Sequence, residues 1–238
     1  IISVFKMSLF TNFISNLKYH YVKTIYGDHN NAKVVKETLS KLLSSLPADA
    51  KGLNIGAGKS KIDSRISNLE MEAGEGIDIV GSVENIPCPD NCFDFVITQE
   101  VLEHVKSPFT AIQEIYRVLK PGGTAYIQLP FVIGFHPCPA DYWRFTHEGI
   151  VALTETTSLK IIETKMSTGP AVGFYRIFVE FASILFSFNM QFLYMLSKVF
   201  FSLIFYPIKW LDPILSKTKQ AKRIAGGYFV LCEKVNRP

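Results

Sequence analysis

The chain has 238 residues, 48% of them apolar and 19% charged, and a formal net charge of +4. This length and apolar content allow a sizeable buried core, which excludes an intrinsically disordered chain. The four cysteines are too scattered for a disulfide framework and show no zinc-ligand spacing with histidine, and the first residues lack the apolar core and cleavage site of a secretory signal. We therefore expect a cytoplasmic protein with reduced thiols.

Basic residues are concentrated in one part of the chain. The segment 171–223 contains seven Lys or Arg and two acidic residues, so it carries a net charge of +5 and the remainder −1. The same segment is rich in Phe, Leu and Ile, and its charges do not form a basic face interleaved with base-reading polar groups. An anionic membrane surface is therefore the expected partner, and nucleic acid is not.

The predicted elements alternate between strands and helices after a helical start. Apolar residues at helical spacing precede Pro47, and the run from Ser107 to Gly123 combines an N-cap, an early proline, an apolar face and a terminating Pro-Gly-Gly. Short apolar runs predict strands at 53–55, 66–69, 77–80, 93–98 and 124–129, and strand-like runs recur at 159–165 and 227–234. This alternation predicts an α/β fold with a largely parallel sheet and helices on both faces.

A glycine turn, in the stretch GLNIGAGKS at 52–60, follows the first predicted strand. It is not a P-loop, because Leu53 stands where that motif requires its first glycine, and it lacks the full G-x-G-x-x-G that a nicotinamide-dependent reductase would favour. Gly56 and Gly58 permit a ligand to approach the backbone closely, and Glu70, ending the second strand, can accept hydrogen bonds from ribose hydroxyls. The combination predicts an adenosine-containing cofactor.

Four motifs in order, NIGAGKS, NLEMEAGEGIDIVGSVENIP, DNCFDFVITQEVLEHV and EIYRVLKPGG, resemble the class I S-adenosylmethionine-dependent methyltransferases of the group often called type 11. The resemblance spans about residues 51–129 and continues more weakly to the end of the chain. It implies a Rossmann-like three-layer sandwich with a mostly parallel seven-stranded sheet, an antiparallel last strand and S-adenosyl-L-methionine as cofactor. In this chain an apolar helical insertion would lie between strands six and seven.

The resemblance also implies which residues contact the cofactor. It assigns the loop under the methionine part to Asn54, Gly56, Ala57 and Gly58, the ribose to Glu70, the adenine to Ser82 and Val83, and the sulfonium to Thr98 and Gln99. The chain departs from the family pattern where Asn54 replaces an acid, Ser60 a glycine and Ser82 an aspartate. Because Gly58 and Glu70 are close in sequence, the first crossover helix must be abbreviated.

The loop FHPCPADYWRFT, at 135–146, follows the fifth predicted strand and is expected to face the methyl acceptor. Similar H-P…DYWRF(T) loops occur in methyltransferases that look associated with cell-surface glycan pathways. His136 and Asp141 are the candidate bases for an oxygen acceptor, and His104 is a third candidate. The alternative is that Asp141 and Arg144 form a salt bridge that fixes the loop, with Trp143 packed beneath it.

The insertion at 170–223 is the least expected feature for an enzyme of this fold. A single membrane span would leave the strand at 227–234 on the far side of the bilayer, separated from its sheet. Two interfacial or re-entrant helices over 174–211, with Trp210 at headgroup level, avoid this conflict. The alternative is a hydrophobic cap that packs on the domain or on a dimer partner.

These observations predict N-terminal helices over 1–50 and a methyltransferase domain over 51–238. The predicted function is an O-methyltransferase, peripheral on the cytoplasmic face of the membrane, that acts on a lipid-linked saccharide or other amphiphilic acceptor. A prenylated phenol or quinone precursor is the alternative acceptor. A non-catalytic, membrane-associated cofactor-binding protein is the alternative from another class, based on the departures at Asn54, Ser60 and Ser82. The sequence leaves the oligomeric state open and predicts no metal.

Overall fold

The computed structural model describes residues 21, 24–25, 27–58 and 61–235, and forms a seven-stranded sheet covered by helices. The predicted N-terminal helical region before residue 21 and the position of Ser60 lie outside these residues. The strands are β1 (Gly52–Ile55), β2 (Ile66–Glu70), β3 (Ile79–Val80), β4 (Phe93–Gln99), β5 (Leu119–Pro130), β6 (Leu159–Thr168) and β7 (Gly227–Lys234). Each includes residues that the apolar runs predicted, because buried β-strands require such runs.

The strand order is β3-β2-β1-β4-β5-β7-β6. Strands β1 to β5 pair in parallel, whereas β7 pairs antiparallel with both β5 and β6, with Ile127 opposite Val230 and Ile161 opposite Cys232. This topology confirms the predicted mostly parallel sheet with an antiparallel last strand. The strand order reverses at β1 and β4, so their carboxyl ends form the crevice in which ligands of such sheets bind.

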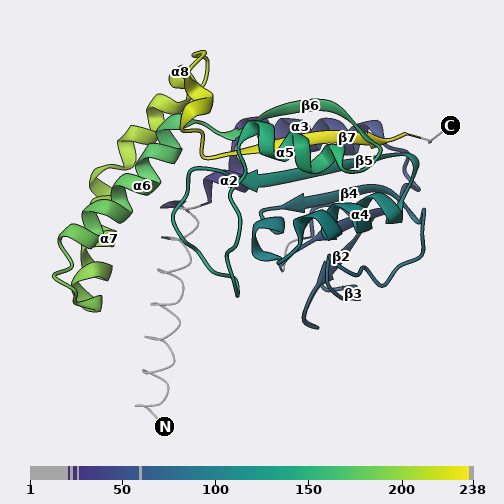
Figure 1. The fold of residues 1–238 in the computed structure, drawn as a ribbon, viewed down its shortest axis with the longest axis horizontal. Helices are drawn as coiled ribbons and strands as arrows, with labels where there is room; N and C mark the ends of the chain where they lie inside the picture. The colour runs from purple at the N-terminus through teal and green to yellow at the C-terminus, as the bar shows by residue number, and fades with distance from the viewer. Residues whose placement is uncertain (1–20, 22–23, 26, 59–60, 236–238) are drawn as a thin grey trace, which may run out of the picture.

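Helices cover the two faces of the sheet in separate layers (Figure 1). On one face, α3 (Lys33–Ser45) buries Val35 and Leu39 against Phe95 and Tyr126 of the sheet. On the other face lie α4 (Pro108–Val118) and α5 (His147–Glu155), whose buried residues pack on β1, β4, β5 and β7. Ser107 caps α4 by accepting a hydrogen bond from the Thr110 amide at 3.2 Å, as the N-cap pattern predicted.

Two connections differ from the sequence prediction. Strand β5 begins at Leu119 and not at Thr124, because the Pro-Gly-Gly run that ends α4 is already part of the strand. The described residues between β1 and β2, 56–58 and 61–65, contain no helix. The first crossover, which was expected to contain a shortened helix, is therefore non-helical along its described part. That part supplies no helix to the α3 face of the sheet.

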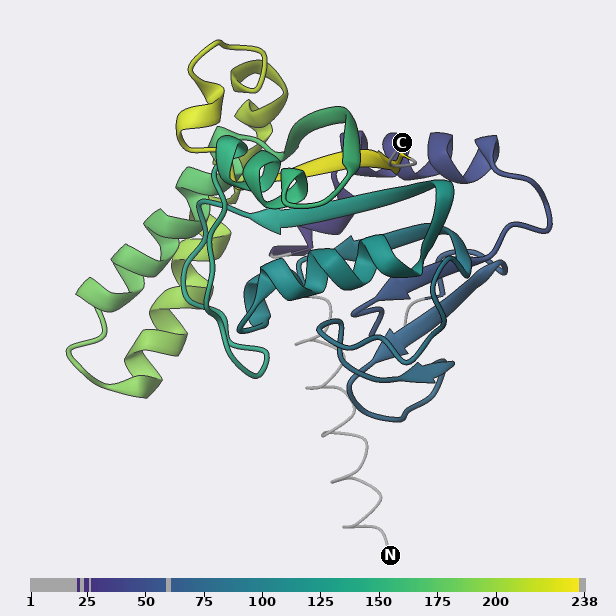
Figure 2. The same ribbon diagram turned by 45° about the vertical axis from the view of Figure 1, so that its right-hand side comes forward.

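An apolar helical hairpin, α6 (Pro170–Leu185) and α7 (Gln191–Ile204), lies between β6 and β7 and projects beyond one end of the sheet (Figures 1 and 2). It is followed by η2 (Tyr206–Leu211), α8 (Asp212–Leu215) and η3 (Ala221–Arg223). One side of α6 is buried, where Tyr175 and Val179 pack with Ile25, and Phe201 and Phe205 of α7 contact this cluster. The hairpin thus has a small core of its own.

The base of the hairpin is fixed to the sheet by backbone contacts. The Asp212 carboxylate accepts hydrogen bonds from the amides of Gly169, Ala171 and Val172 at 2.8, 2.7 and 3.2 Å, which caps α6. A Cβ atom at Gly173 would lie 2.3 Å from the Ile224 carbonyl oxygen, so only glycine permits this approach of α6 to the segment before β7. The hairpin is therefore anchored at one end.

The outer side of the hairpin exposes large apolar side chains. Those more than 60% exposed are Ile184, Phe181, Phe192 and Phe188. Among the described residues no single helix has the length and hydropathy to cross a bilayer, although α7 and the following segment Tyr206–Leu215, bent by 43°, meet the criteria jointly.

Candidate active site

The glycine turn after β1 has the backbone conformation that the sequence predicted. Gly56 and Gly58 have φ angles of +67° and +55°, which are strained for other residues. A Cβ atom at Gly56 would also lie 2.2 Å from a methyl carbon of Val101. The Gly58 amide donates a hydrogen bond of 2.5 Å to the Glu70 carboxylate at the end of β2. The turn and Glu70 therefore face each other.

A cavity of about 180 Å³, which we call the Glu70 cavity, lies beside this turn. Four of the nine predicted cofactor residues line it: Gly56, Glu70, Ser82 and Val83. Its other walls include Leu69, Val101, His104 and Val105. A carboxylate next to apolar walls at the carboxyl ends of β1 and β2 is the combination that holds an adenosine, with ribose hydroxyls on the acid and the base on aliphatic side chains.

The donors and acceptors of the Glu70 cavity suit an adenosine, but its volume is below the roughly 300 Å³ at which small-molecule pockets usually begin. Glu70 takes up part of the space, since its carboxylate is bonded to the Gly58 amide. We expect this hydrogen bond to be replaced by bonds to the ribose hydroxyls when a nucleoside binds. The residues thus fit the cofactor chemically, and Glu70 is the side chain that must move.

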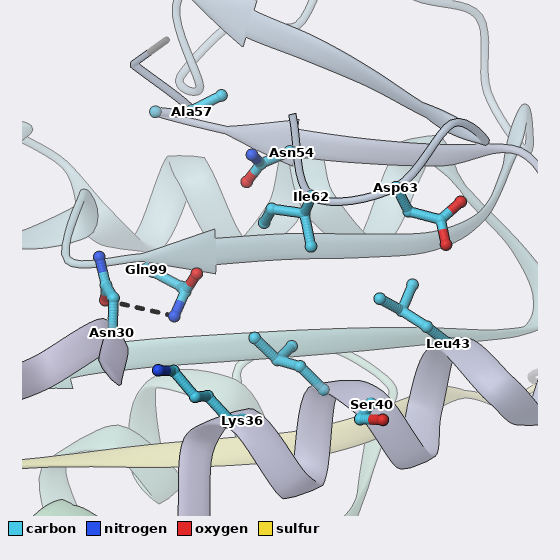
Figure 3. A pocket seen from close by; sticks show the side chains of 11 residues that line it. Asn30, Lys36, Ser40, Leu43, Asn54, Ala57, Ile62, Asp63 and Gln99 are labelled. Atoms are coloured by element: carbon cyan, nitrogen blue, oxygen red, sulfur yellow. Dashed lines mark hydrogen bonds between the residues drawn. The ribbon is translucent and has the colours of Figure 1, made fainter. Parts of the chain in front are cut away.

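A second cavity, of about 560 Å³, lies on the α3 face and is named here the Asn54 cavity (Figure 3). Asn54, Ala57 and Gln99 line it, together with side chains of α3 such as Lys36 and Ser40, and Gln99 donates a hydrogen bond of 3.2 Å to Asn30. Gly56 borders both cavities. The structure therefore separates Asn54, Ala57 and Gln99 from Glu70, Ser82 and Val83.

Thr98 and Gly58, the remaining predicted cofactor residues, line neither cavity. Thr98 is fully buried in β4, on the face opposite that of Gln99, because successive residues of a strand point to opposite sides. Gly58 contributes through its amide, as described above. The cofactor roles assigned to all nine residues stay predictions.

A third cavity, of about 430 Å³ and named the His136 cavity, lies between the sheet and the helical hairpin. It is lined by His136 and its neighbours in the loop after β5, by Glu100 after β4, and by Arg176, Glu180 and Lys198 of the hairpin. Lys198 forms an ion pair with Glu180. This cavity joins the predicted acceptor loop to the insertion, two segments that the sequence analysis considered separately.

Glu100, at the wall of the His136 cavity, belongs to a buried ionic group. Its carboxylate lies 2.6 Å from Nδ1 of His29, which is 4% exposed. Burial raises the pKa of Glu100, but the charges of His29 and then Arg176 outweigh it, so the net pKa lies below its ordinary value. The sequence analysis missed these residues. The one local signal was Glu100 itself, two residues beyond the strand predicted at 93–98. Its φ angle of +58° is uncommon for a non-glycine residue.

The candidate bases His104 and His136 lie together, with Glu103 between them. Glu103 and His104 belong to the short helix η1 (Leu102–His104). The Nε2 atoms of His104 and His136 lie 3.6 and 3.8 Å from Oε1 of Glu103, and the two rings are in edge contact with centroids 5.1 Å apart. Burial raises the pKa of Glu103, and Glu103 in turn raises the pKa of His136. We call these three residues the Glu103 cluster.

Asp141, the other candidate base, is held by Arg144 in two hydrogen bonds of 2.6 and 2.7 Å. Arg144 lowers the pKa of Asp141 well below its usual range, and the Asp141 side chain is 1% exposed. The salt bridge that the sequence offered as the alternative is therefore present. Trp143 is 38% exposed and bonds to the Val105 carbonyl through its indole nitrogen, so it is not packed beneath the loop.

Comparisons with known proteins agree with the fold and the glycine turn. The family model described as a methyltransferase domain matches residues 33–127. A demethylmenaquinone methyltransferase of Geobacillus sp. (strain WCH70) is 36% identical over 92 residues, 37% of this chain and 36% of that protein. The mitochondrial ubiquinone biosynthesis O-methyltransferase of Rattus norvegicus is 47% identical over 49 residues, 18% of this chain and 14% of that protein.

Solved structures extend the likeness of fold over most of the chain. The 1,6-didemethyltoxoflavin-N1-methyltransferase of Burkholderia thailandensis, solved with its substrate and S-adenosylhomocysteine, has a TM-score of 0.53 and 13% identity, with 98% of this chain and 90% of that chain covered. The chain carries a class I S-adenosylmethionine-dependent methyltransferase domain of the type 11 family, for which S-adenosylmethionine is the typical cofactor. It spans about a third of the length of the first curated relative.

Proposed function

We propose that this protein transfers a methyl group from S-adenosylmethionine to a hydroxyl of an amphiphilic acceptor at a membrane surface. The observation that carries the proposal is the position of the His136 cavity, which has the carboxyl end of β4 on one side and the apolar hairpin on the other. The hairpin side chains in the cavity wall are the charged Arg176, Glu180 and Lys198, so the cavity would take the polar end of the acceptor. Its apolar part would lie on the exposed apolar side chains of the hairpin outside the cavity.

The Glu70 cavity is the proposed cofactor site. Glu70 would hold the ribose, Val83 and Ser82 would flank the adenine, and the Gly56 turn would accept the methionine part. When bound, the cofactor supplies a methyl group activated by the positive sulfonium. The protein's own contribution is alignment, because an in-line displacement depends chiefly on the position of the two reacting atoms.

The His136 cavity is the proposed acceptor site. His104 lines the Glu70 cavity and His136 lines the His136 cavity, so the Glu103 cluster lies between the two proposed sites. A hydroxyl must lose its proton on methylation, and the cluster places one histidine in each cavity. Glu100 lines both cavities, but its carboxylate is paired with His29. Asp141 would orient the loop and leave the proton to the cluster, since Arg144 occupies its carboxylate.

Membrane association is proposed for the hairpin. A patch of exposed Phe, Ile and Leu side chains on α6 and α7 exceeds what isolated surface apolar residues explain, and such patches mark interaction surfaces. Trp210 is 70% exposed beyond α7, and the segment carries the excess of lysines noted above. This combination suits an anionic lipid surface more than water.

Two acceptor classes fit this proposal. The loop 135–146 favours a lipid-linked saccharide through its likeness to loops of glycan-pathway methyltransferases. The demethylmenaquinone and ubiquinone methyltransferases among the relatives favour a prenylated phenol or quinone precursor. Both acceptors combine a hydroxyl with an apolar chain, and the charged lining of the His136 cavity suits the polar part of either.

The test is transfer of label from methyl-labelled S-adenosylmethionine into extracts. We expect label in lipid-soluble products, either in prenylated phenols or in saccharides released by mild acid from a lipid carrier. Gly56→Val, which fills the glycine turn, serves as the inactive control. Label only in water-soluble products would contradict the amphiphilic acceptor. No label in any fraction, from protein that binds S-adenosylhomocysteine, would support the non-catalytic binding protein instead.

A further inference from the structure

We propose that Glu103, His104 and His136 form a binding site for a first-row divalent transition metal, with Zn²⁺ as the best-suited ion. The binding itself does not depend on the proposed methyl transfer. The three side chains come from two segments, η1 and the loop after β5, which are more than 30 residues apart in the sequence. Their potential ligand atoms all lie within 4.8 Å of one another, and they are the one such group among the described residues.

The distances within the Glu103 cluster are those of ligands around a shared ion. The Nε2 atoms of His104 and His136 are 3.6 and 3.8 Å from Oε1 of Glu103, which is too long for a hydrogen bond. Ligands that are each about 2.0–2.1 Å from Zn²⁺ in a tetrahedral site lie roughly 3.4 Å apart. Shifts of a few tenths of an ångström would therefore bring each Nε2 atom to the ligand spacing from Glu103, and the ligand atoms of the cluster as a whole already lie within 4.8 Å of one another.

Both imidazole rings are oriented with Nε2 towards the Glu103 carboxylate. Nδ1 of His104 lies 2.5 Å from the Ala140 carbonyl oxygen, and Nδ1 of His136 lies 3.0 Å from the Gly134 carbonyl oxygen. A carbonyl only accepts, so each Nδ1 carries a proton, and in the neutral ring, which is the form that binds metal, each Nε2 presents a lone pair. A backbone carbonyl that holds the second nitrogen is the usual outer-sphere support of a metal-binding histidine.

Arg144 does not reverse this assignment for His136. Its Nη2 atom lies 3.2 Å from Nδ1 of His136, but the two hydrogens on that nitrogen are already directed to the Gly134 carbonyl at 2.9 Å and to Asp141 at 2.7 Å. Around Nδ1 there are therefore two acceptors and a donor that is already used. The proton stays on Nδ1, and the lone pair of Nε2 faces the cluster.

Glu103 is the second, independent reason to expect a cation. Its side chain is fully buried, and neither carboxylate oxygen has a hydrogen-bond partner among the described residues. Buried polar atoms nearly always have partners, because desolvation of a carboxylate without compensation costs several kcal/mol or a proton. A divalent ion between Glu103 and the two imidazoles would supply the missing partner.

The ligand set favours Zn²⁺ over Mg²⁺. Two imidazole nitrogens and one carboxylate oxygen match catalytic zinc sites, in which three protein ligands leave one position open, whereas Mg²⁺ prefers oxygen ligands. If the proposed function holds, the open position lies between the cofactor and acceptor cavities, where an ion would lower the pKa of an acceptor hydroxyl. That consequence rests on the proposed function, but the metal site does not.

The test is direct metal binding to full-length, tag-free protein that has been treated with a chelator and dialysed. Titration with Co²⁺ followed by visible absorption, and with Zn²⁺ by calorimetry, should give one ion per chain, with Mg²⁺ at the same concentration giving no signal. His104→Ala and His136→Ala should each weaken Zn²⁺ binding by about 100-fold or more. Loss of an outer-sphere partner alone costs up to about 100-fold in metal affinity, and loss of a direct ligand should cost at least as much.

Two further variants keep the result interpretable. Glu103→Gln preserves the side-chain volume and removes the carboxylate. If this variant fails to bind metal but melts at the same temperature as the parent, the loss is due to the missing ligand and not to misfolding. His147→Ala removes a histidine outside the cluster and should bind one ion as the parent does. Absence of Co²⁺ bands in the parent protein would overturn the proposal. So would a Zn²⁺ affinity in the three cluster variants that equals that of the parent protein. Titration of the metal-free protein with S-adenosylhomocysteine tests the proposed function separately.

Discussion

Helices α4 and α7 have similar apolar patterns, but the structure uses them in different ways. In α4 the apolar residues Ala111, Ile112, Ile115 and Val118 are fully buried against the sheet. In α7 the one buried residue among those described is Ser202, and Phe192 is 72% exposed. The comparison teaches that apolar periodicity predicts a helix but not what covers its apolar face. A lipid surface as the partner of the hairpin, as proposed above, would account for the difference.

The largest expected effect separates the core from the hairpin. Ile115→Ala in α4 should lower the free energy of unfolding by about 2–5 kcal/mol, since it removes fully buried carbons and leaves a cavity. The same substitution at Ile184 of α6, which is 64% exposed, should change it by less than about 0.5 kcal/mol. Chemical denaturation measures both. Equal destabilisation would show that the outer side of the hairpin is buried in solution, as a protein cap would be.

The next effect concerns binding to lipid. Phe192→Ser should weaken binding to vesicles that contain anionic lipid by about 10- to 100-fold, since an inserted Phe contributes roughly 1.5–3 kcal/mol. Phe109→Ser, which makes the same change at an exposed residue of α4, is the matched control and should bind as the parent does. Vesicle flotation measures both variants. Unchanged binding of Phe192→Ser, or a self-associating parent protein, would favour a dimer partner for the hairpin.

The smallest effect concerns the end of α3. Arg65 donates a hydrogen bond of 2.9 Å to the Leu43 carbonyl at the end of α3 and also bonds to Asp63. The hydrogen bonds from Arg65 to Asp63 lower the pKa of Asp63 to about 2. A lowered carboxyl pKa stabilises the fold above the unfolded value of about 4, and the contribution disappears as the pH falls towards 2. Because solvent screens the pair, Asp63→Asn should cost under about 1 kcal/mol at pH 7.

The pH dependence of that variant tests the assignment. Urea unfolding at pH 7 and at pH 3 should show a smaller difference between Asp63→Asn and the parent at the lower pH. A difference that does not change between the two pH values would mean that Asp63 acts through its shape or its neutral hydrogen bonds, and not through its charge.

Much of the fold could be predicted because its signals are local. The strands coincide with short runs that are rich in apolar residues, and α4 carries its own N-cap at Ser107 and its terminator at Pro121. The Gly56 turn was predictable for the same reason, since a positive φ next to a crowded side chain requires glycine. The predicted start of β5 was wrong because a Pro-Gly-Gly run that ends a helix can also form the first part of a strand.

The candidate site was less predictable because its groups meet through topology. Glu100 contacts His29 and lies near Arg176 of the hairpin, and no local pattern relates these three segments. Glu103 was overlooked beside His104, since an acid in a short helix is usually exposed and only the fold makes it fully buried. Asn54 in β1 and Glu70 at the end of β2 lie on the same face of the sheet, since Asn54 pairs with Asn68, yet they line separate cavities that Gly56 borders.

Calorimetric titration with S-adenosylhomocysteine tests the central claim, a cofactor site at the Gly56 turn, most directly. The parent protein should bind S-adenosylhomocysteine in preference to ATP and NAD, and Gly56→Val should lose that binding. Gly122→Val, which also places valine at a positive φ of +78°, lies near the start of β5, outside the three cavities and with no atom within 4 Å of the added Cβ, and should keep it. Folded parent protein that fails to bind S-adenosylhomocysteine, or a Gly56→Val variant that binds it equally well, would contradict the account.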